Sequence, residues 1–137
     1  MRLVVDNHAE RNAGAFSRPM VAAGSMALLM ALQENERNDV IARNGRRYRN
    51  HGALSEEQVR AMLLDSLDIG FGLNRSRIIA GISGVGVSIP TSAEAAYAAL
   101  SIAAIDARIL DEGRQRELLL MLKHEAQTIS RELGCRG

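Results

Sequence analysis

Hydrophobic positions in the middle of the chain recur with the period of a helix. At residues 55–58 the sequence SEEQ can cap a helix N-terminus, because the Ser55 hydroxyl accepts from first-turn amides while the Gln58 side chain reaches back. Four apolar residues then follow at positions i, i+3, i+4 and i+8: Val59, Met62, Leu63 and Leu67. This spacing predicts an amphipathic helix whose apolar stripe faces the core.

Three other segments also have helical character. Pro19 precedes the run MVAAGSMALLMALQ, whose apolar residues surround the helix and therefore predict deep burial. Residues 34–43 (ENERNDVIAR) predict a short polar helix anchored by Val40 and Ile41 and ended at Asn44–Gly45. Asp111 is placed to cap a long C-terminal helix that ends at Gly134. Its apolar stripe is Leu118, Leu122, Ala126, Ile129 and Leu133.

Strands are predicted between and before these helices. Arg2–Asp6 is a short β-branched run, and Gly70–Leu73 and Ile78–Ile79 are strand candidates around a turn. Gly84–Pro90 alternates Val and Ile with Gly and Ser, which is the period-2 pattern of a strand. Residues 95–105 are ambiguous, because their alanines favour a helix and periodicity alone does not decide between helix and strand.

Length and composition indicate one compact domain over residues 1–137, with no membrane span. The chain is 47% hydrophobic and 24% charged, which is ordinary for a globular protein. Its formal net charge of +1 gives no electrostatic basis for binding DNA or an anionic membrane. The single cysteine, Cys135, excludes an internal disulfide framework. The first residues lack the layout of a signal peptide, so we expect a cytoplasmic protein.

Two local motifs suggest chemistry but fit a structural role better. Residues 81–86 (GISGVG) match neither a phosphate-binding loop nor a nucleophile elbow, so these glycines are interpreted as places where a strand bends or a ligand approaches closely. Arg43, Arg46, Arg47 and Arg49 form a basic cluster, which is interpreted as a solvated loop or subunit contact in preference to a phosphate or nucleic-acid site.

The ionisable residues predict neither a metal site nor a catalytic centre. His8, His51 and His124 are far apart and have no ligands at zinc spacing, and no cofactor motif is present. A Ser101–His124 pair would be needed for hydrolase activity, but the sequence assigns it no orienting acid. We therefore expect a protein that is not an enzyme.

An ordered series of segments from about Pro19 to Leu133 resembles the C-terminal effector-binding domain of IclR-family transcriptional regulators. The segments are AAGSMALL, ENERNDVI, a capped helix leading to DIGFGLN, the strands GISGVGVSIP and AYAALSIAAI, and the closing helix RQRELLLMLKHEAQTISREL. The resemblance implies an α+β fold, similar to GAF domains, with an antiparallel sheet flanked by helices. It also favours a strand over about Tyr97–Ile105.

The resemblance further implies a ligand pocket on one face of the sheet. Carried over position by position, its residues are Ala23, Gly24, Asn74, Gly84, Ser101 and Ala103. Some members of the family have an acid at the position of Asn74, a cysteine at that of Gly84 and a second serine at that of Ala103. Fewer polar groups therefore face the pocket here, which implies a more apolar or a larger ligand than a simple oxo-acid.

The resemblance leaves two hypotheses about function open. The first is a sensor of a small, carboxylate-type effector, forming a homodimer or higher oligomer and reaching DNA only through a helix-turn-helix that this chain lacks. Family members begin with that DNA-binding domain and the first strands of the sheet, whereas this chain begins with RLVVD, so a sheet truncated at its N-terminal side is expected. The alternative is an interaction module with a vestigial pocket.

Overall fold

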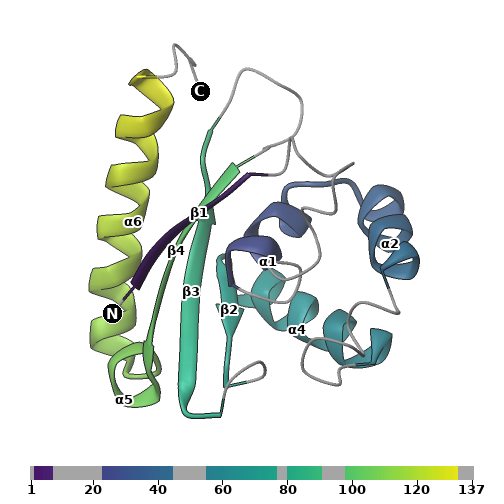
Figure 1. Cartoon of the computed structure of the whole chain (residues 1–137), viewed down its shortest axis with the longest axis horizontal. Coiled ribbons are helices and arrows are strands. Elements are labelled where there is room, and N and C mark those ends of the chain that lie inside the picture. The colour runs from purple at the N-terminus through teal and green to yellow at the C-terminus, as the bar shows by residue number, and fades with distance from the viewer. Residues whose placement is uncertain (1, 8–22, 45–54, 77–79, 91–97, 133–137) are drawn as a thin grey trace.

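A computed structural model describes residues 2–7, 23–44, 55–76, 80–90 and 98–132, the first of these ranges as backbone alone. The described residues form four strands and several helices (Figure 1). In chain order the elements are β1 (Arg2–Asn7), α1 (Ala23–Met30), α2 (Glu34–Arg43), α4 (Glu56–Ile69), β2 (Gly72–Asn74), β3 (Ile82–Ser88), β4 (Ala98–Ile105), α5 (Asp106–Ile109) and α6 (Glu112–Glu132).

The strands form one antiparallel sheet in the order β1-β4-β3-β2. The sheet stands in the middle of the molecule, with α6 along one side and α1, α2 and α4 on the other (Figure 1). The described chain is therefore α+β with an antiparallel sheet flanked by helices, which confirms the expected fold class. The alanine-rich segment is strand β4 and pairs on both sides, with β1 and β3.

The sheet face toward α6 carries the branched and large apolar residues. Because side chains alternate along a strand, Val85 and Val87 of β3 share this face with Leu100 and Ile102 of β4. They pack with Leu122 and Ala126 of α6, which are 1% and 2% exposed. The predicted stripe of α6 is thus confirmed for its described members.

The opposite face is built from small residues and is covered by α1. All residues of α1 from Ala23 to Leu29 are buried, as the apolar run predicts. Met26 and Leu29 turn away from the sheet and join a second core with α2 and α4. Ala27 and Leu28 pack instead on Ala99 of β4.

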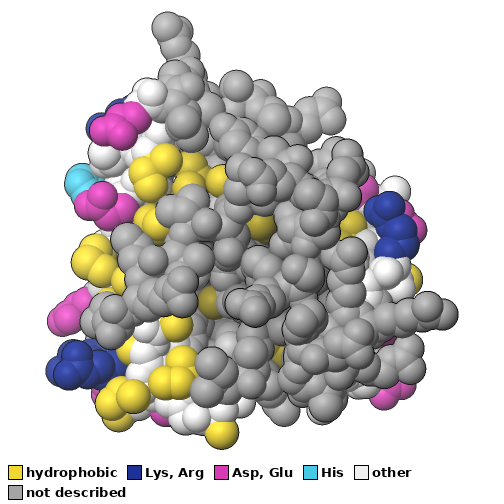
Figure 2. Space-filling model, viewed as in Figure 1, with side chains coloured by type: hydrophobic (Ala, Val, Ile, Leu, Met, Phe, Trp, Pro, Cys, Tyr) yellow, Lys and Arg dark blue, Asp and Glu magenta, His cyan; other side chains and the backbone are white. Residues whose placement is uncertain are grey.

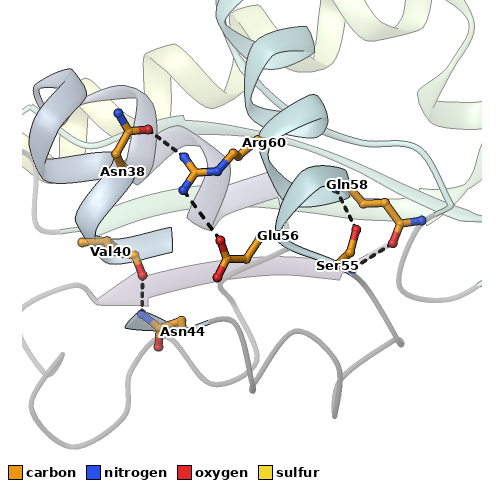
Figure 3. A network of polar contacts seen from close by, with 7 residues as sticks. All are labelled: Asn38, Val40, Asn44, Ser55, Glu56, Gln58 and Arg60. Atoms are coloured by element: carbon orange, nitrogen blue, oxygen red, sulfur yellow. Dashed lines mark hydrogen bonds and ion pairs between the residues drawn. The ribbon is translucent and has the colours of Figure 1, made fainter. Parts of the chain in front are cut away.

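Local capping explains where α4 begins and ends. The Ser55 N–H donates to Gln58 Oε1 at 2.8 Å, and the Gln58 N–H donates to Ser55 Oγ at 3.2 Å, so the predicted capping box is confirmed (Figure 3). Arg60 of α4 donates to Asn38 Oδ1 of α2 at 2.7 Å and ties the two helices together. Gly70 ends α4 in the left-handed region, with φ of 89°.

The structure differs from the sequence-based expectations at several places. The strand predicted from Gly70 starts at Gly72, because Gly70 serves as the C-cap of α4. Leu67 is 37% exposed and does not join the core; Ser66, at i+7 from Val59, takes that position and accepts a hydrogen bond from the Leu73 N–H at 3.1 Å. The helical turn α5 was not predicted.

Several predicted features lie outside the described residues. They are the loop His8–Ser17, the helix start at Pro19, the cluster Arg46–Arg49, the strand Ile78–Ile79, Tyr97, Leu133, Gly134, and the side chains His8, His51 and Cys135.

Candidate functional site

The six residues expected to line a ligand pocket lie in four elements that meet on the α1 face of the sheet. Ala23 and Gly24 begin α1, and Asn74 is the last residue of β2. Gly84 lies in β3, and Ser101 and Ala103 lie in β4. Residues up to 80 positions apart in the sequence are thereby brought to one surface.

The strand register places these residues in adjacent rows. Asn74 pairs with Gly84, and Gly84 pairs with Ala103, so these three form one row across β2, β3 and β4. The next row on the same face contains Ser101, which pairs with Gly86. Ser101 and Ala103 are two residues apart on β4 and therefore face the same side, which joins the two rows into one patch.

Glycines allow α1 to approach the sheet backbone to backbone. A Cβ atom built on Gly86 would stand 2.7 Å from the Ala23 carbonyl oxygen and 2.8 Å from the Gly24 nitrogen. On Gly72 it would stand 2.0 Å from the same Ala23 oxygen. At Gly84 the nearest side-chain atom of α1 is the Ala23 Cβ, 3.4 Å from a built Cβ. The first turn of α1 is therefore fixed directly above the candidate residues.

The candidate patch is small, nearly buried and free of formal charge. Asn74 and Ser101 are each 8% exposed and Ala23 is 3% exposed. An amide and a hydroxyl supply its side-chain polarity, and the positive end of the α1 dipole lies at Ala23 and Gly24. The patch can offer hydrogen bonds to a small polar ligand, and no carboxylate among the six would repel an anion.

A second polar cluster lies where β3 begins and β4 ends. Asp106 accepts hydrogen bonds from the hydroxyls of Ser83 at 2.6 Å and Ser76 at 2.7 Å. Those hydrogen bonds, that of Ser83 first, lower the pKa of Asp106 below its usual value. Its backbone N–H donates to the Gly81 carbonyl at 2.9 Å. The cluster therefore fastens the chain after β2, including Ser76 at a φ of 54°, to the start of α5.

The structure separates Ser101 from His124. Ser101 lies on the α1 face, whereas His124 is an exposed residue of α6, on the other side of the sheet. The Ser101–His124 pair that hydrolase activity would need is therefore not formed. Within the described ranges no group of three His, Cys, Asp or Glu residues is placed to hold a metal ion, and no helix there is long and apolar enough to cross a membrane.

A cavity of about 270 Å³ lies at the β2 edge of the sheet, lined from the α1 side and by Lys123 of α6, and contains none of the six residues. It is lined by Ala27, Met30, Ala31, Gly70, Phe71, Gly72, Gly86, Val87, Ser88 and Lys123. The amino-acid sequence does not mark these residues as a set. The glycines in GFG and GVG were the available signal, since a glycine in a strand can mark a close approach of backbone or ligand.

Comparison with solved structures shows which fold this is. The IclR protein of Thermotoga maritima matches with a TM-score of 0.68 at 22% identity, over 83% of this chain and 46% of that protein. The C-terminal domain of the E. coli transcriptional regulator KdgR matches with a TM-score of 0.68 at 21% identity, over 83% of this chain and 70% of that one. The repressor BlcR of Agobacterium tumefaciens matches with a TM-score of 0.63 at 21% identity, over 83% and 46%.

The chain spans about half the length of several of these regulators. No model of a protein family matches the sequence, and no curated protein does so. The structural matches show that the described chain has the fold of the C-terminal domain of IclR transcriptional regulators.

Proposed function

We propose that the chain belongs to the IclR family and acts as a non-enzymatic, effector-binding domain. It binds a small carboxylate metabolite on the α1 face of the sheet, at the six residues Ala23, Gly24, Asn74, Gly84, Ser101 and Ala103. These residues are called the effector patch below. One observation carries the proposal: the strand register and the contact of α1 bring the whole set to one surface.

The chemistry of the effector patch favours an anionic ligand with few polar groups. The amides at the start of α1 can donate to a carboxylate, and the helix dipole favours negative charge there. Asn74 and Ser101 can add hydrogen bonds from the sheet, and both are nearly buried, so each bond would form away from bulk water. A Cβ atom on Gly84 would already lie 3.2 Å from the Ile102 carbonyl oxygen and 3.4 Å from the Ala23 Cβ, so the apolar part of the ligand must be small.

We propose that effector binding changes the conformation or the assembly of the protein. A ligand that binds one conformer better than another shifts the equilibrium between them by its difference in affinity. In a regulator that also carries a helix-turn-helix, this shift would change how two DNA-binding domains sit on an operator. We place the chain in the cytoplasm, as a homodimer or higher oligomer, with edge strands β1 and β2 available for association.

The test is a thermal-stability screen of small carboxylates against the full chain. At a ligand concentration one hundred times Kd the stabilisation is about 2.7 kcal/mol, or roughly 10 °C in Tm for a domain of this size. Asn74→Leu and Ser101→Val should each abolish most of the shift. Thr128→Val removes a hydroxyl from α6, across the sheet, and should leave it intact. Equal shifts in the wild type and in both patch variants would reject the effector patch.

Exposed leucines favour the interaction module as a second function. Leu64 on α4 is 65% exposed and Leu120 on α6 is 68% exposed. Hydrophobic side chains also show beside charged ones along the α6 side of the molecule (Figure 2). Under this hypothesis the chain pairs with a full-length regulator. Association that is lost in Leu64→Glu or Leu120→Glu, and unchanged by every carboxylate tested, would support it over the sensor.

A further inference from the structure

The cavity of about 270 Å³ exists because β2 is short. Gly70 turns the chain sharply after α4, and β2 pairs with β3 only from Gly72 opposite Gly86 to Asn74 opposite Gly84. Val87 and Ser88 continue β3 beyond Gly86, the residue that pairs with the first residue of β2. A Cβ atom built on Gly70 would meet nothing within 4 Å, so this corner is open space.

The walls of the cavity are partly apolar and partly polar, and its charge comes from one residue. Met30, Phe71 and Val87 supply hydrocarbon surface from α1, from the turn before β2 and from β3. Lys123 of α6 is the single ionisable residue among the ten that line the cavity. Among the described residues its ammonium forms no ion pair, and its side chain is exposed. The cavity therefore combines hydrocarbon surface with one positive charge that has no ion-pair partner among the described residues.

Three backbone carbonyl groups at and just beyond the C-terminal end of α1 already accept hydrogen bonds. The Leu28 carbonyl accepts from the Ala31 N–H at 3.2 Å, and the Leu29 carbonyl accepts from the Leu32 N–H at 3.1 Å. The Leu32 carbonyl accepts from Arg37 at 2.8 Å. These three residues do not line the cavity, so the formal charge that a ligand meets there is that of Lys123.

We propose that this cavity is a second ligand site, which takes a small monocarboxylate with a branched or cyclic hydrocarbon body. The body lies against Met30, Phe71 and Val87, and the carboxylate pairs with Lys123. One water occupies about 30 Å³ in the liquid, so the cavity holds a ligand of roughly ten heavy atoms. The site shares no residue with the effector patch and therefore goes beyond the proposed function.

The test uses the full chain, cyclohexanecarboxylate, and the uncharged analogue cyclohexylmethanol. In a nitrogen-15 NMR titration the carboxylate should move the backbone signals of Gly70, Gly72 and Val87 while those of Gly24 and Ala103 stay in place. Lys123→Met keeps an apolar stem and removes the charge, so it should weaken carboxylate binding about fivefold, as expected for an exposed ion pair. It should leave cyclohexylmethanol binding unchanged, and Lys123→Arg should restore the carboxylate affinity.

Arg116→Met is the matched control, because Arg116 is an exposed cation of α6 outside the cavity and its loss should have no effect. Three results would overturn the second site: no shifts at millimolar ligand, equal affinity in Lys123→Met, or an equal loss of affinity in Arg116→Met. Shifts confined to Gly24 and Ala103, and lost in Asn74→Leu, would reject the second site and leave the effector patch standing. Shifts at Gly70 and Val87 that persist in Asn74→Leu support the second site whether or not the effector patch binds anything.

Discussion

The contact between α1 and β3 makes a quantitative prediction for Gly86→Ala. The added Cβ would lie 2.7 Å from the Ala23 carbonyl oxygen and 2.8 Å from both the Ala23 carbonyl carbon and the Gly24 nitrogen. Ordinary contacts of carbon atoms are about 3.5–4.0 Å, so the first turn of α1 must move by about 1 Å. All three atoms belong to the backbone of a buried helix, so no side chain can rotate to make room.

The expected cost of Gly86→Ala lies at the upper end of the range for overpacking, about 3 kcal/mol. For a domain of this size that corresponds to a fall in Tm of roughly 10 °C. Urea unfolding followed by circular dichroism measures this loss of unfolding free energy. Gly113→Ala is the matched control: its Cβ would meet only Asp111 Oδ2, at an ordinary 3.5 Å, and alanine favours a helix, so α6 should be unchanged or stabilised by up to about 1 kcal/mol.

Gly84→Ala gives an intermediate case, because its Cβ would lie 3.2 Å from the Ile102 carbonyl oxygen and 3.4 Å from the Ala23 Cβ. Its cost should fall between those of the other two variants. Neutral surface substitutions usually change the free energy of unfolding by no more than about 0.5 kcal/mol. A change that small in Gly86→Ala would mean that α1 does not rest on β3 as described.

Two further predictions concern the edges and the core of the sheet. The hydroxyls of Ser83 and Ser76 lower the pKa of Asp106, so its ionised form stabilises the fold above the usual carboxyl range, and that contribution is lost as the pH falls through the lowered pKa. Asp106→Asn should therefore reduce stability at pH 7 and flatten the dependence of unfolding free energy on pH in the acid range, measured by urea titration; an unchanged pH profile would contradict this. Leu122→Ala should cost about 2–5 kcal/mol, because Leu122 is 1% exposed, whereas Leu120→Ala, at 68% exposed, should stay within about 0.5 kcal/mol in the same assay. Equal costs would mean that α6 presents a different face to the sheet.

The features that the sequence predicts well depend on neighbouring residues. The capping box at Ser55 is formed by residues three apart, so its signal is complete within one turn of helix. The Asp111 cap works in the same way, since its carboxylate accepts from the Arg114 N–H at 3.0 Å. The alternation of Gly84–Pro90 likewise predicts β3 correctly, although the strand begins earlier, at Ile82.

The features that the sequence did not predict depend on distant contacts. Ser66 faces the core in place of Leu67 because its hydroxyl has a partner, the Leu73 N–H, across the turn after α4. The alanines of β4 would suit a helix in isolation, and only pairing on both sides makes them a strand. A family resemblance supplied that assignment and the residues of the effector patch. Nothing in the local sequence marks Lys123 as part of a cavity wall.

A nitrogen-15 NMR titration of the full chain with a panel of small carboxylates tests the effector patch most directly. The account predicts that at least one of them moves the backbone signals of Gly24, Asn74, Gly84 and Ser101 together, with a single dissociation constant, and that Ser101→Val abolishes these shifts. If every carboxylate that binds leaves those four signals in place, the α1 face of the sheet is not the sensing surface.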